Sequence, residues 1–312
     1  MRLRVAIVAD WLNNLGGAEQ VVKELCAIYP QADIFTSVYD QEKTHGWFSD
    51  HMVTSSFLQK WPLAKKKHQL FGRWRPQAFE SFDLGKYDVV ISSSSAESKG
   101  VITKPSAFHV VYCHTPTRYY WSDYHEYKSR MEFGILNPIA KIIMPMWIHS
   151  LRIWDRVAAE RPDAWIANSH YISQRISKYY KKDSTVIHPP VDTEKFTPLK
   201  DQSQKEDYFF AAGRVIPYKR VDLIVDAANI TGQKVKIAGT GPMLEELKKK
   251  AKSNIEFLGR ISDEDMVVHM QKASAFIFPA EEDFGIVPVE AMSCGTPVIA
   301  YGVGGALDTV IP

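Results

Sequence analysis

Short continuous runs of apolar residues recur along the whole chain, and between many of them apolar positions repeat at helical spacing. Continuous runs are typical of strands buried on both faces of a parallel sheet, because polar and apolar residues alternate only where one face meets water. The intervening segments, such as 18–29 and 241–252, carry apolar residues every three or four positions, which predicts amphipathic helices. The expected strands are 4–10, 32–38, 87–94, 108–114, 164–169, 185–190, 208–213, 234–239, 255–259, 275–280 and 297–301.

This repeated strand–helix–strand order predicts an α/β protein with two doubly wound parallel sheets. Residues 188–207 interrupt the pattern, since they are rich in Pro, Asp, Lys and Gln and have little periodicity. We therefore expect an N-terminal domain over residues 1–190, a linker over 191–206 and a C-terminal domain over 207–312. Two such domains would enclose an interdomain cleft at the C-terminal ends of their strands, where ligands bind in open parallel sheets.

Composition narrows the function classes. The 312 residues are 45% hydrophobic and 24% charged, which excludes a disordered chain. The formal net charge of +2 is too balanced for a dedicated nucleic-acid binder, so no nucleic-acid partner is expected. Basic residues nevertheless exceed acidic ones in residues 1–200, whereas acidic residues exceed basic ones in 201–312. This asymmetry favours an anionic partner for the first domain.

The compartment follows from cysteine usage and from the N-terminus. Cys26, Cys113 and Cys294 lie far apart with no CxxC spacing, which disfavours a disulfide scaffold or a structural zinc site and fits a reducing compartment. The N-terminus runs directly into the first expected strand and lacks a secretory signal pattern. The most apolar window, 133–149, is too short and too interrupted to span a bilayer. We expect a cytoplasmic protein, soluble or peripheral to the membrane.

Two loops after expected strands could hold phosphate. Gly16 and Gly17 precede a helix, whose free N–H groups and positive dipole end suit an anion. Arg214 and Lys219 flank a short turn before another helix and could together clamp a diphosphate. The alternatives are a tight turn without a ligand for the glycines and a solvated basic loop for the two cations.

Three further residues are candidates for ligand contacts. Glu282 and Glu290 are eight positions apart, one in a loop and one in the following helix, and could grip different hydroxyl-bearing parts of one ligand. His114 follows a strand directly, at the end where ligands bind. The alternatives are helix capping for Glu282, a surface position for Glu290 and a structural role for His114.

We expect neither a metal nor any other cofactor. The Asp263-Glu264-Asp265 run matches the D-x-D pattern of metal-dependent sugar transferases, but Ser262 precedes it, and Ser with Asp three residues later is a capping box. Lys248-Lys249-Lys250 likewise complements the dipole at the end of a helix.

Residues 57–79 suggest contact with a membrane surface, because basic and aromatic side chains alternate there and both bind anionic bilayers. A solvated basic helix is the alternative. The residues concerned are Trp61, Phe71, Trp74, Lys60, Lys65, Lys66, Lys67, Arg73 and Arg75.

Taken together, the Gly-Gly loop, the GRVIPYKR segment (213–220) and the E-x7-E pattern of 282–290 resemble the retaining, nucleotide-sugar-dependent glycosyltransferases of family four. The GTPVIAYGVGGALDTV block (295–310) strengthens the resemblance, which covers nearly the whole chain. It implies a GT-B fold of two facing Rossmann-like domains with the active site between them. Segments 91–101 and 113–127 further resemble bacterial mannosyltransferases that build cell-surface polysaccharides.

The resemblance also implies roles for the candidate residues. Arg214 and Lys219 would neutralise the donor pyrophosphate, and Gly16 and Gly17 would approach its distal phosphate. Glu290 would bind the ribose hydroxyls. The sugar would meet Glu282, His114 and the Phe284 and Gly285 amides, and the base would meet Arg260 and Ile261.

The implied activity is transfer of a sugar, with mannose from GDP-mannose favoured, to a lipid-linked or growing glycan with retention of anomeric configuration. Relatives generally continue beyond the segment at which this sequence stops, Pro312, so we expect an incomplete C-terminal domain. Two alternatives stay open: a nucleotide-sugar epimerase or hydrolase of the same architecture, and a non-catalytic nucleotide-sugar-binding module.

Overall fold

The computed structural model of the chain describes residues 3–66, 68–125 and 137–311. Parts of three sequence features lie outside the described residues: Lys67, residues 126–127 of the segment 113–127, and residues 133–136 of the apolar window. The chain divides into two compact units, Met1–Pro190 and Val191–Pro312, and each contains its own parallel sheet.

The first unit is built on a seven-stranded sheet in the order β3-β2-β1-β4-β5-β6-β7, in which every described pairing is parallel. Each expected run forms a strand. The short edge strand β3 was not predicted, because its three residues include no apolar run. The strands are β1 (Val5–Ala9), β2 (Asp33–Thr36), β3 (Val53–Ser55), β4 (Val89–Ser94), β5 (Phe108–Cys113), β6 (Ala164–Ala167) and β7 (Thr185–Val186).

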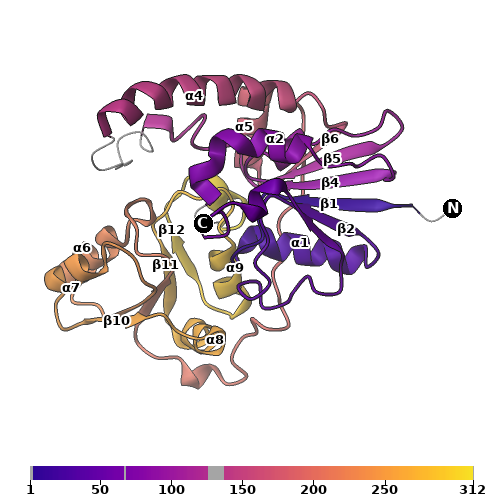
Figure 1. The fold of residues 1–312 in the computed structure, drawn as a ribbon. Coiled ribbons are helices and arrows are strands. Elements are labelled where there is room, and N and C mark those ends of the chain that lie inside the picture. Colours follow the sequence, from indigo (N-terminus) through magenta and orange to yellow (C-terminus); the bar gives the residue numbers. More distant parts are fainter. Residues whose placement is uncertain (1–2, 67, 126–136, 312) are drawn as a thin grey trace. The chain divides into compact units, whose positions relative to one another are not determined.

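Helices cover both faces of this sheet (Figure 1). Val5, Ile7 and Ala9 of β1 pack toward α1, whereas Ala6 and Val8 pack with aromatic residues on the opposite face, so the alternating side chains of one strand serve two cores. This explains why the strand reads as continuously apolar. The α-helices of this unit are α1 (Gly17–Ile28), α2 (Arg75–Glu80), α4 (Asn137–Ala158) and α5 (His170–Tyr180).

The second unit repeats the design with a five-stranded sheet in the order β10-β9-β8-β11-β12. Its described pairings are also parallel, as the buried apolar runs predicted. The strands are β8 (Phe209–Ala212), β9 (Val235–Ala238), β10 (Ile255–Gly259), β11 (Ala275–Phe278) and β12 (Val298–Ala300).

Two pairs of helices sandwich this second sheet (Figure 1). Ala211 of β8 belongs to the core beneath α6 and α7, while Phe210 belongs to the core beneath α8 and α9. Residues 191–206, marked by the sequence as a linker, lie within this unit, and Phe196 is buried in its core. The helices are α6 (Val221–Thr231), α7 (Leu244–Lys250), α8 (Asp263–Lys272) and α9 (Ile286–Ser293).

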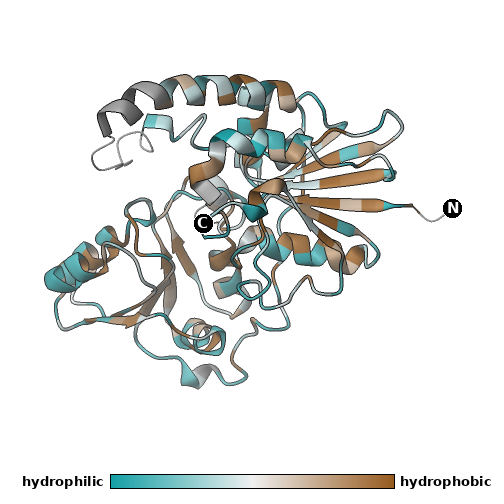
Figure 2. Cartoon of the chain, viewed as in Figure 1, coloured by the Kyte–Doolittle hydropathy of each residue, from teal (hydrophilic) through white to brown (hydrophobic). Residues whose placement is uncertain are grey.

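Hydropathy follows this layering, with apolar residues concentrated on the strands and polar ones on outer helix surfaces such as α7 (Figure 2). None of the helices searched in the described part of the chain is both long enough and apolar enough to cross a membrane.

Candidate functional site

Each sheet has one point at which the strand order reverses, and several of the candidate residues lie there. In the first unit this point lies between β1 and β4, and in the second between β8 and β11. Loops leaving adjacent strands in opposite directions open a crevice at such a point, and ligands of doubly wound sheets bind there. The Gly16-Gly17 loop follows β1, the segment with Arg214 and Lys219 follows β8, and the Glu282 loop follows β11.

In the second unit, Arg214 and Lys219 line the same pocket at the ends of β8, β9 and β11. Arg214 is exposed and donates from Nη2 to the Tyr218 hydroxyl at 2.9 Å. Lys219 ends a single turn of 3₁₀ helix, η6 (Pro217–Lys219), and Arg220 terminates that turn in the left-handed conformation with φ of 53°. Because the segment between them is so short, Arg214 and Lys219 both border this pocket.

Two glycines missed at the sequence level make this loop possible. A Cβ on Gly239 would lie 1.8 Å from the Gly213 carbonyl oxygen, and a Cβ on Gly241 would lie 2.1 Å from that of Val215. The loop after β9 therefore packs directly on the backbone that carries Arg214. The recognisable signal was a Gly-Thr-Gly sequence immediately after a strand.

The loop after β11 brings Glu282 to Lys219. Its Oε1 atom lies 2.5 Å from Lys219 Nζ, and the two side chains are 19% and 20% exposed. Gly285 has φ of 85°, which favours glycine, and begins α9 without a side-chain cap, so the first N–H groups of that helix have no capping side chain. Phe284, in the same loop, is buried at 6% exposure.

A second glycine pair, Gly304 and Gly305, fixes this acidic loop. The Gly305 N–H donates to the Glu282 carbonyl at 2.8 Å, and a Cβ on Gly304 would lie 2.6 Å from that same oxygen. A Cβ on Gly305 would meet Phe284 Cα at 2.3 Å. These glycines belong to the 295–310 block recognised in the sequence, and their task is close backbone packing.

The remaining candidates of the second unit form a separate group. Glu290 lies on α9, and burial raises its pKa to about 7, with nearby Lys195 opposing this rise and Asp263 adding to it. Ile261, like Val287, is partly buried against the core that includes Phe276, whereas Arg260 is exposed at the end of β10. The structure therefore brings Arg214, Lys219 and Glu282 together, and places Glu290 beside the start of α8.

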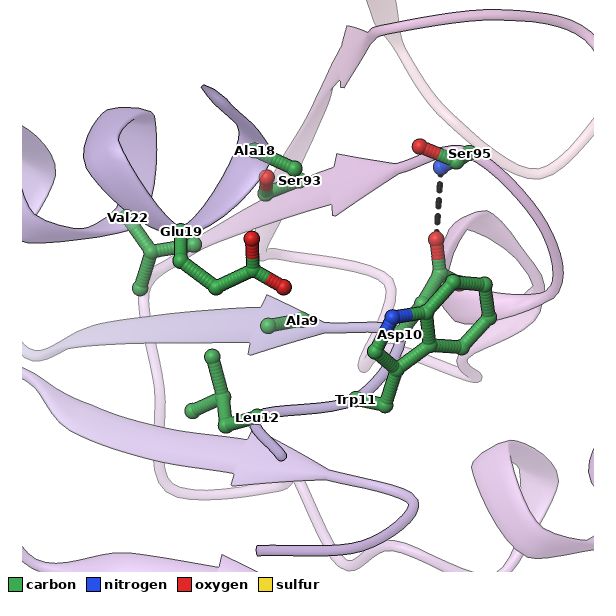
Figure 3. A pocket seen from close by; sticks show the side chains of 9 residues that line it. All are labelled: Ala9, Asp10, Trp11, Leu12, Ala18, Glu19, Val22, Ser93 and Ser95. Carbon is green, nitrogen blue, oxygen red and sulfur yellow. Dashed lines mark hydrogen bonds between the residues drawn. The ribbon is translucent and has the colours of Figure 1, made fainter. Parts of the chain in front are cut away.

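In the first unit, a carboxylate missed at the sequence level occupies the Gly16-Gly17 loop. Glu19, in the first turn of α1, is 4% exposed, and its carboxylate is turned into a pocket bordered by Ala9, Trp11 and Ser93 (Figure 3). Burial raises its pKa to about 7, and backbone N–H groups of Glu19 and Gly16 oppose the rise by hydrogen bonding. The arrangement is that of a capping glutamate, and it already engages part of the expected anion site.

Asp10, at the end of β1, lies at the same edge of the sheet. Its buried carboxylate accepts hydrogen bonds from the backbone N–H groups of Ser95 at 2.5 Å, Ala96 at 2.9 Å and Ser98 at 2.8 Å, the first of which is drawn in Figure 3. Asp10 thereby ties the loop after β4 to the end of β1, and so holds the reversal point together.

His114 stands at the end of β5, as the sequence indicated. Its Nε2 lies 2.8 Å from Ser93 Oγ, and its carbonyl accepts from Asn168 Nδ2 at 3.0 Å. Burial lowers the pKa of His114 to about 4, so the imidazole is neutral at pH 7. A neutral ring held by Ser93 can exchange hydrogen bonds with a hydroxyl-bearing ligand, but carries no charge toward a phosphate.

Behind these loops lies a buried ionic network. Arg75 Nε is 3.0 Å from Glu97 Oε2, and Lys99 Nζ is 2.5 Å from Asp155 Oδ1, with every side chain at most 4% exposed. The segments 91–101 and 113–127 supply most of its members, which explains their polar sequences. Further hydrogen bonds to the two carboxylates come from Thr117, Tyr120, Trp121 and Tyr180.

The capping interpretation of the acidic run is confirmed. Ser262 Oγ accepts from the Asp265 N–H at 3.0 Å and caps α8. Among the described residues, no group of three or more His, Cys, Asp or Glu side chains could hold a metal ion.

Two families of known proteins match the chain. Residues 15–195 match the family described as Glycosyltransferase Family 4, and residues 192–312 match the one described as Glycosyl transferases group 1. The E. coli O-antigen chain mannosyltransferase C is 26% identical over 94% of this chain and 77% of its own length. An uncharacterized glycosyltransferase of Methanocaldococcus jannaschii is 32% identical over 51% of this chain, and D-rhamnosyltransferase WbpZ of Pseudomonas aeruginosa is 27% identical over 54%. The chain spans just under half the length of these last two relatives, 46% in each case.

Solved structures share the fold. Anabaena HepE in complex with UDP matches with a TM-score of 0.70 at 17% identity, over 99% of this chain and 84% of its own. Sucrose-phosphate synthase from Thermosynechococcus elongatus also gives a TM-score of 0.70, at 19% identity, over 100% of this chain and 84% of its own. The predicted architecture, two Rossmann-like domains of the GT-B type, is confirmed. Since the Family 4 match alone spans more than half of its length, the chain belongs to Glycosyltransferase Family 4.

Proposed function

We propose that this protein transfers mannose from GDP-mannose to a lipid-linked or growing glycan with retention of configuration. The observation that carries the proposal is the pocket at the ends of β8, β9 and β11, where Arg214 and Lys219 stand together beside Glu282. Two cations at the reversal point of a parallel sheet fit a diphosphate, because both charges can be neutralised there without a metal.

The chemistry demands charge stabilisation more than proton transfer. As the bond from sugar to diphosphate breaks, negative charge grows on the phosphate and positive charge on the ring. Arg214 and Lys219 would stabilise the former. Glu282 would orient the sugar and favour its cationic character, rather than act as a nucleophile. The acceptor proton would pass to the leaving phosphate oxygen, so the proposal needs no general base from the protein.

The first unit would supply the remaining sugar contact. His114 is neutral and its Nε2 is taken by Ser93. Within the described residues its Nδ1 makes no hydrogen bond, and this atom is the one we assign to a sugar hydroxyl. Phe284 and Gly285 would add backbone N–H groups, Glu290 the ribose contacts, and Arg260 with Ile261 the base contacts.

The choice of sugar rests on relatives. O-antigen chain mannosyltransferase C of E. coli aligns with nearly the whole chain, and mannosyltransferases named as GDP-mannose-dependent in Corynebacterium glutamicum and Mycolicibacterium smegmatis align with 46% of it, at 31% and 28% identity respectively. Because HepE was solved with UDP and UDP-glucose, UDP sugars are the rival donors to test.

A donor screen tests the proposal. The full chain is incubated with GDP-mannose, UDP-glucose or neither, with and without a lipid-linked glycan acceptor, in the presence of excess chelator. We expect mannose transfer from GDP-mannose that needs acceptor and survives the chelator. Rapid donor conversion without acceptor would favour an epimerase or hydrolase, and donor binding without turnover would favour a binding module. Loss of turnover with chelator, restored by magnesium or manganese, would contradict charge neutralisation by Arg214 and Lys219.

We further propose that the first unit meets an anionic membrane surface on the cytoplasmic side. Exposed apolar side chains within residues 57–74 stand among exposed cations, a combination that favours anionic bilayers. The exposed apolar side chains are Phe57, Leu63, Leu70 and Trp74, and the exposed cations are Lys60, Lys65, Lys66 and Arg73.

One residue drops out of that surface. Arg75 is 3% exposed and pairs with Glu97, so its inclusion in the basic face was wrong. Trp61 and Phe71 are only half-buried, and they pack against each other with ring centroids 5.4 Å apart. We therefore expect both rings to pack beneath the exposed residues of this surface rather than to insert into a bilayer.

A further inference from the structure

The ion pair between Lys219 and Glu282 has a consequence for how the proposed donor binds. Lys219 Nζ lies 2.5 Å from Glu282 Oε1, and each side chain is about four-fifths buried. Glu282 Oε1 is buried without a hydrogen-bond partner among the described residues, so the lysine is its one charged contact there. A carboxylate oxygen in this setting depends on the lysine for its stabilisation.

Both ends of the pair are held by rigid backbone. Glu282 is fixed through its carbonyl, which accepts from the Gly305 N–H at 2.8 Å. The Lys219 ammonium lies 5.8 Å and 5.7 Å from the ring centroids of Tyr218 and Phe278, which confine its position. The pair is therefore a built feature of the pocket rather than a chance surface contact.

Arg214, the other cation of the pocket, has a different kind of partner. Arg214 lines the same pocket, yet its partner is the neutral hydroxyl of Tyr218 at 2.9 Å, and it forms no ion pair among the described residues. Of the two cations assigned to the diphosphate, one is open to an incoming anion and the other already holds a carboxylate.

We propose that Glu282 is an internal competitor for the diphosphate: its carboxylate holds Lys219 in the ligand-free protein and must give it up when a diphosphate binds. This inference rests on the proposed function for its ligand class, a nucleoside diphosphate and its sugar ester. No covalent step is involved, since one ion pair replaces another.

The competition favours donor over product. When a nucleotide sugar binds, the displaced carboxylate meets sugar hydroxyls, which donate hydrogen bonds to it. When the bare diphosphate binds, the displaced carboxylate gains no such donors and faces a second anion, which repels it. Glu282 thus weakens the leaving product selectively and helps to release it after transfer.

Titration calorimetry with GDP and with inorganic pyrophosphate tests the proposal on the full chain. Glu282→Gln keeps the shape and removes the charge, so both anions should bind about three- to tenfold more tightly, the range expected when a partly buried ion pair no longer competes. Glu264→Gln, at an exposed position of α8, changes the net charge equally and should leave both affinities unaltered.

A double-mutant cycle isolates the mechanism. The gain from Glu282→Gln should be much smaller in a Lys219→Ala background, because no lysine remains to be released and only the repulsion between carboxylate and anion is relieved, and it should persist in full in an Arg214→Ala background. Unchanged or weaker anion binding by a folded Glu282→Gln variant overturns the proposal, as does a gain that is undiminished in the Lys219→Ala background. Circular dichroism and thermal melting establish that each variant is folded.

The outcomes separate this inference from the proposed function. Tighter pyrophosphate binding by Glu282→Gln, in a protein that turns over no nucleotide sugar, supports the competition and contradicts the transferase. Turnover of GDP-mannose by the wild type, with no gain in GDP or pyrophosphate affinity in the variant, supports the transferase and overturns the competition.

Discussion

The two reversal points of this molecule are built from similar elements but treat their charges differently. In the first unit, the charged groups behind the loops are almost fully buried and pair with one another, as in Arg75–Glu97 and Lys99–Asp155. In the second unit, Arg214 is exposed and Lys219 is 20% exposed in an open pocket. The buried charged side chains of the first unit therefore hold its loops in place, whereas Arg214 and Lys219 of the second unit line a pocket that a ligand can enter.

The difference shows why a list of charged residues near strand ends does not identify a binding site. A buried pair is satisfied within the protein, and removing one partner leaves an uncompensated charge. A cation that lines an open pocket attracts an anion strongly, since water is partly excluded around it. The same residue types thus perform structural work in one unit and recognition in the other.

Asp155→Ala should produce the largest effect and tests the first half of this comparison. The change strands Lys99 and removes the acceptor of Tyr180 and Trp121, so unfolding free energy should fall by about 3–5 kcal/mol. Chemical denaturation measures this. Asp263→Ala, at the exposed start of α8, is the control in the second unit and should cost under about 1 kcal/mol. Similar losses for the two variants would erase the distinction.

Glu19→Gln should produce the second-largest change in unfolding free energy, and this change should depend on pH. The folded-state pKa of about 7 exceeds the ordinary value of 4.5, so the folded protein binds a proton that the unfolded chain does not, and stability falls as pH rises through that window. Glutamine keeps the capping geometry and does not titrate. The variant should therefore gain up to roughly 3 kcal/mol over wild type at pH 8 and little near pH 4.5.

Thermal melts of wild type and Glu19→Gln from pH 5 to pH 8 test this. Glu290→Gln gives the same measurement in the second unit, where the pKa is also about 7. The exposed Glu42→Gln serves as a control. A wild-type advantage that grows with pH would reverse the assigned sign.

Lys219→Ala tests the other half of the comparison. Loss of one charge-assisted contact should weaken GDP binding by about 10- to 150-fold, or roughly 1.5–3 kcal/mol. Because the change also leaves Glu282 unpaired, the unfolding free energy should fall, but by less than for Asp155→Ala, whose pair is fully buried. Calorimetry and denaturation report the two quantities separately. Lys249→Ala, in the last turn of α7, should change neither. Destabilisation without an affinity change would make Lys219 a structural residue like Lys99.

The smallest expected effect concerns the basic surface of the first unit. Replacing Lys65 and Lys66 by Ser should weaken binding to anionic vesicles by about 1 kcal/mol for each charge. Co-sedimentation with phosphatidylserine-containing and with neutral vesicles measures it. Lys248 and Lys249 replaced by Ser provide a matched pair in the second unit. Equal binding to both vesicle types, or to neither, would exclude this surface as a membrane contact.

Much of the fold was predictable because its signals are local. Continuous apolar runs marked every strand longer than three residues, and Ser262 with Asp265 marked the start of α8. The edge strand β3 (Val53–Ser55) was not predicted because it contains no apolar run. Candidate loops could be located because a doubly wound sheet always presents its strand ends to the ligand.

The sequence could not predict which polar groups pair. The local sequence of Glu19 is that of an ordinary helix residue, and only the fold shows that Glu19 is buried beside Gly16. Likewise, nothing in the local sequence distinguishes Lys99, which is buried, from Lys219, which lines a pocket. The prediction of Arg75 as part of a basic surface was wrong for the same reason. Burial depends on which elements cover a side chain, and that information lies elsewhere in the chain.

The sequence by itself determined the two parallel sheets, the loops at their reversal points and the membership of Glycosyltransferase Family 4, because all three depend on patterns a few residues long. Tertiary structure alone decided that Glu282 pairs with Lys219, 63 positions away in the sequence. It also decided that Gly304 and Gly305 fix the acidic loop. In the first unit, it decided that the buried charges pair with one another. Such contacts join loops from different strands, and their energies depend on distance and burial, which only the folded chain defines.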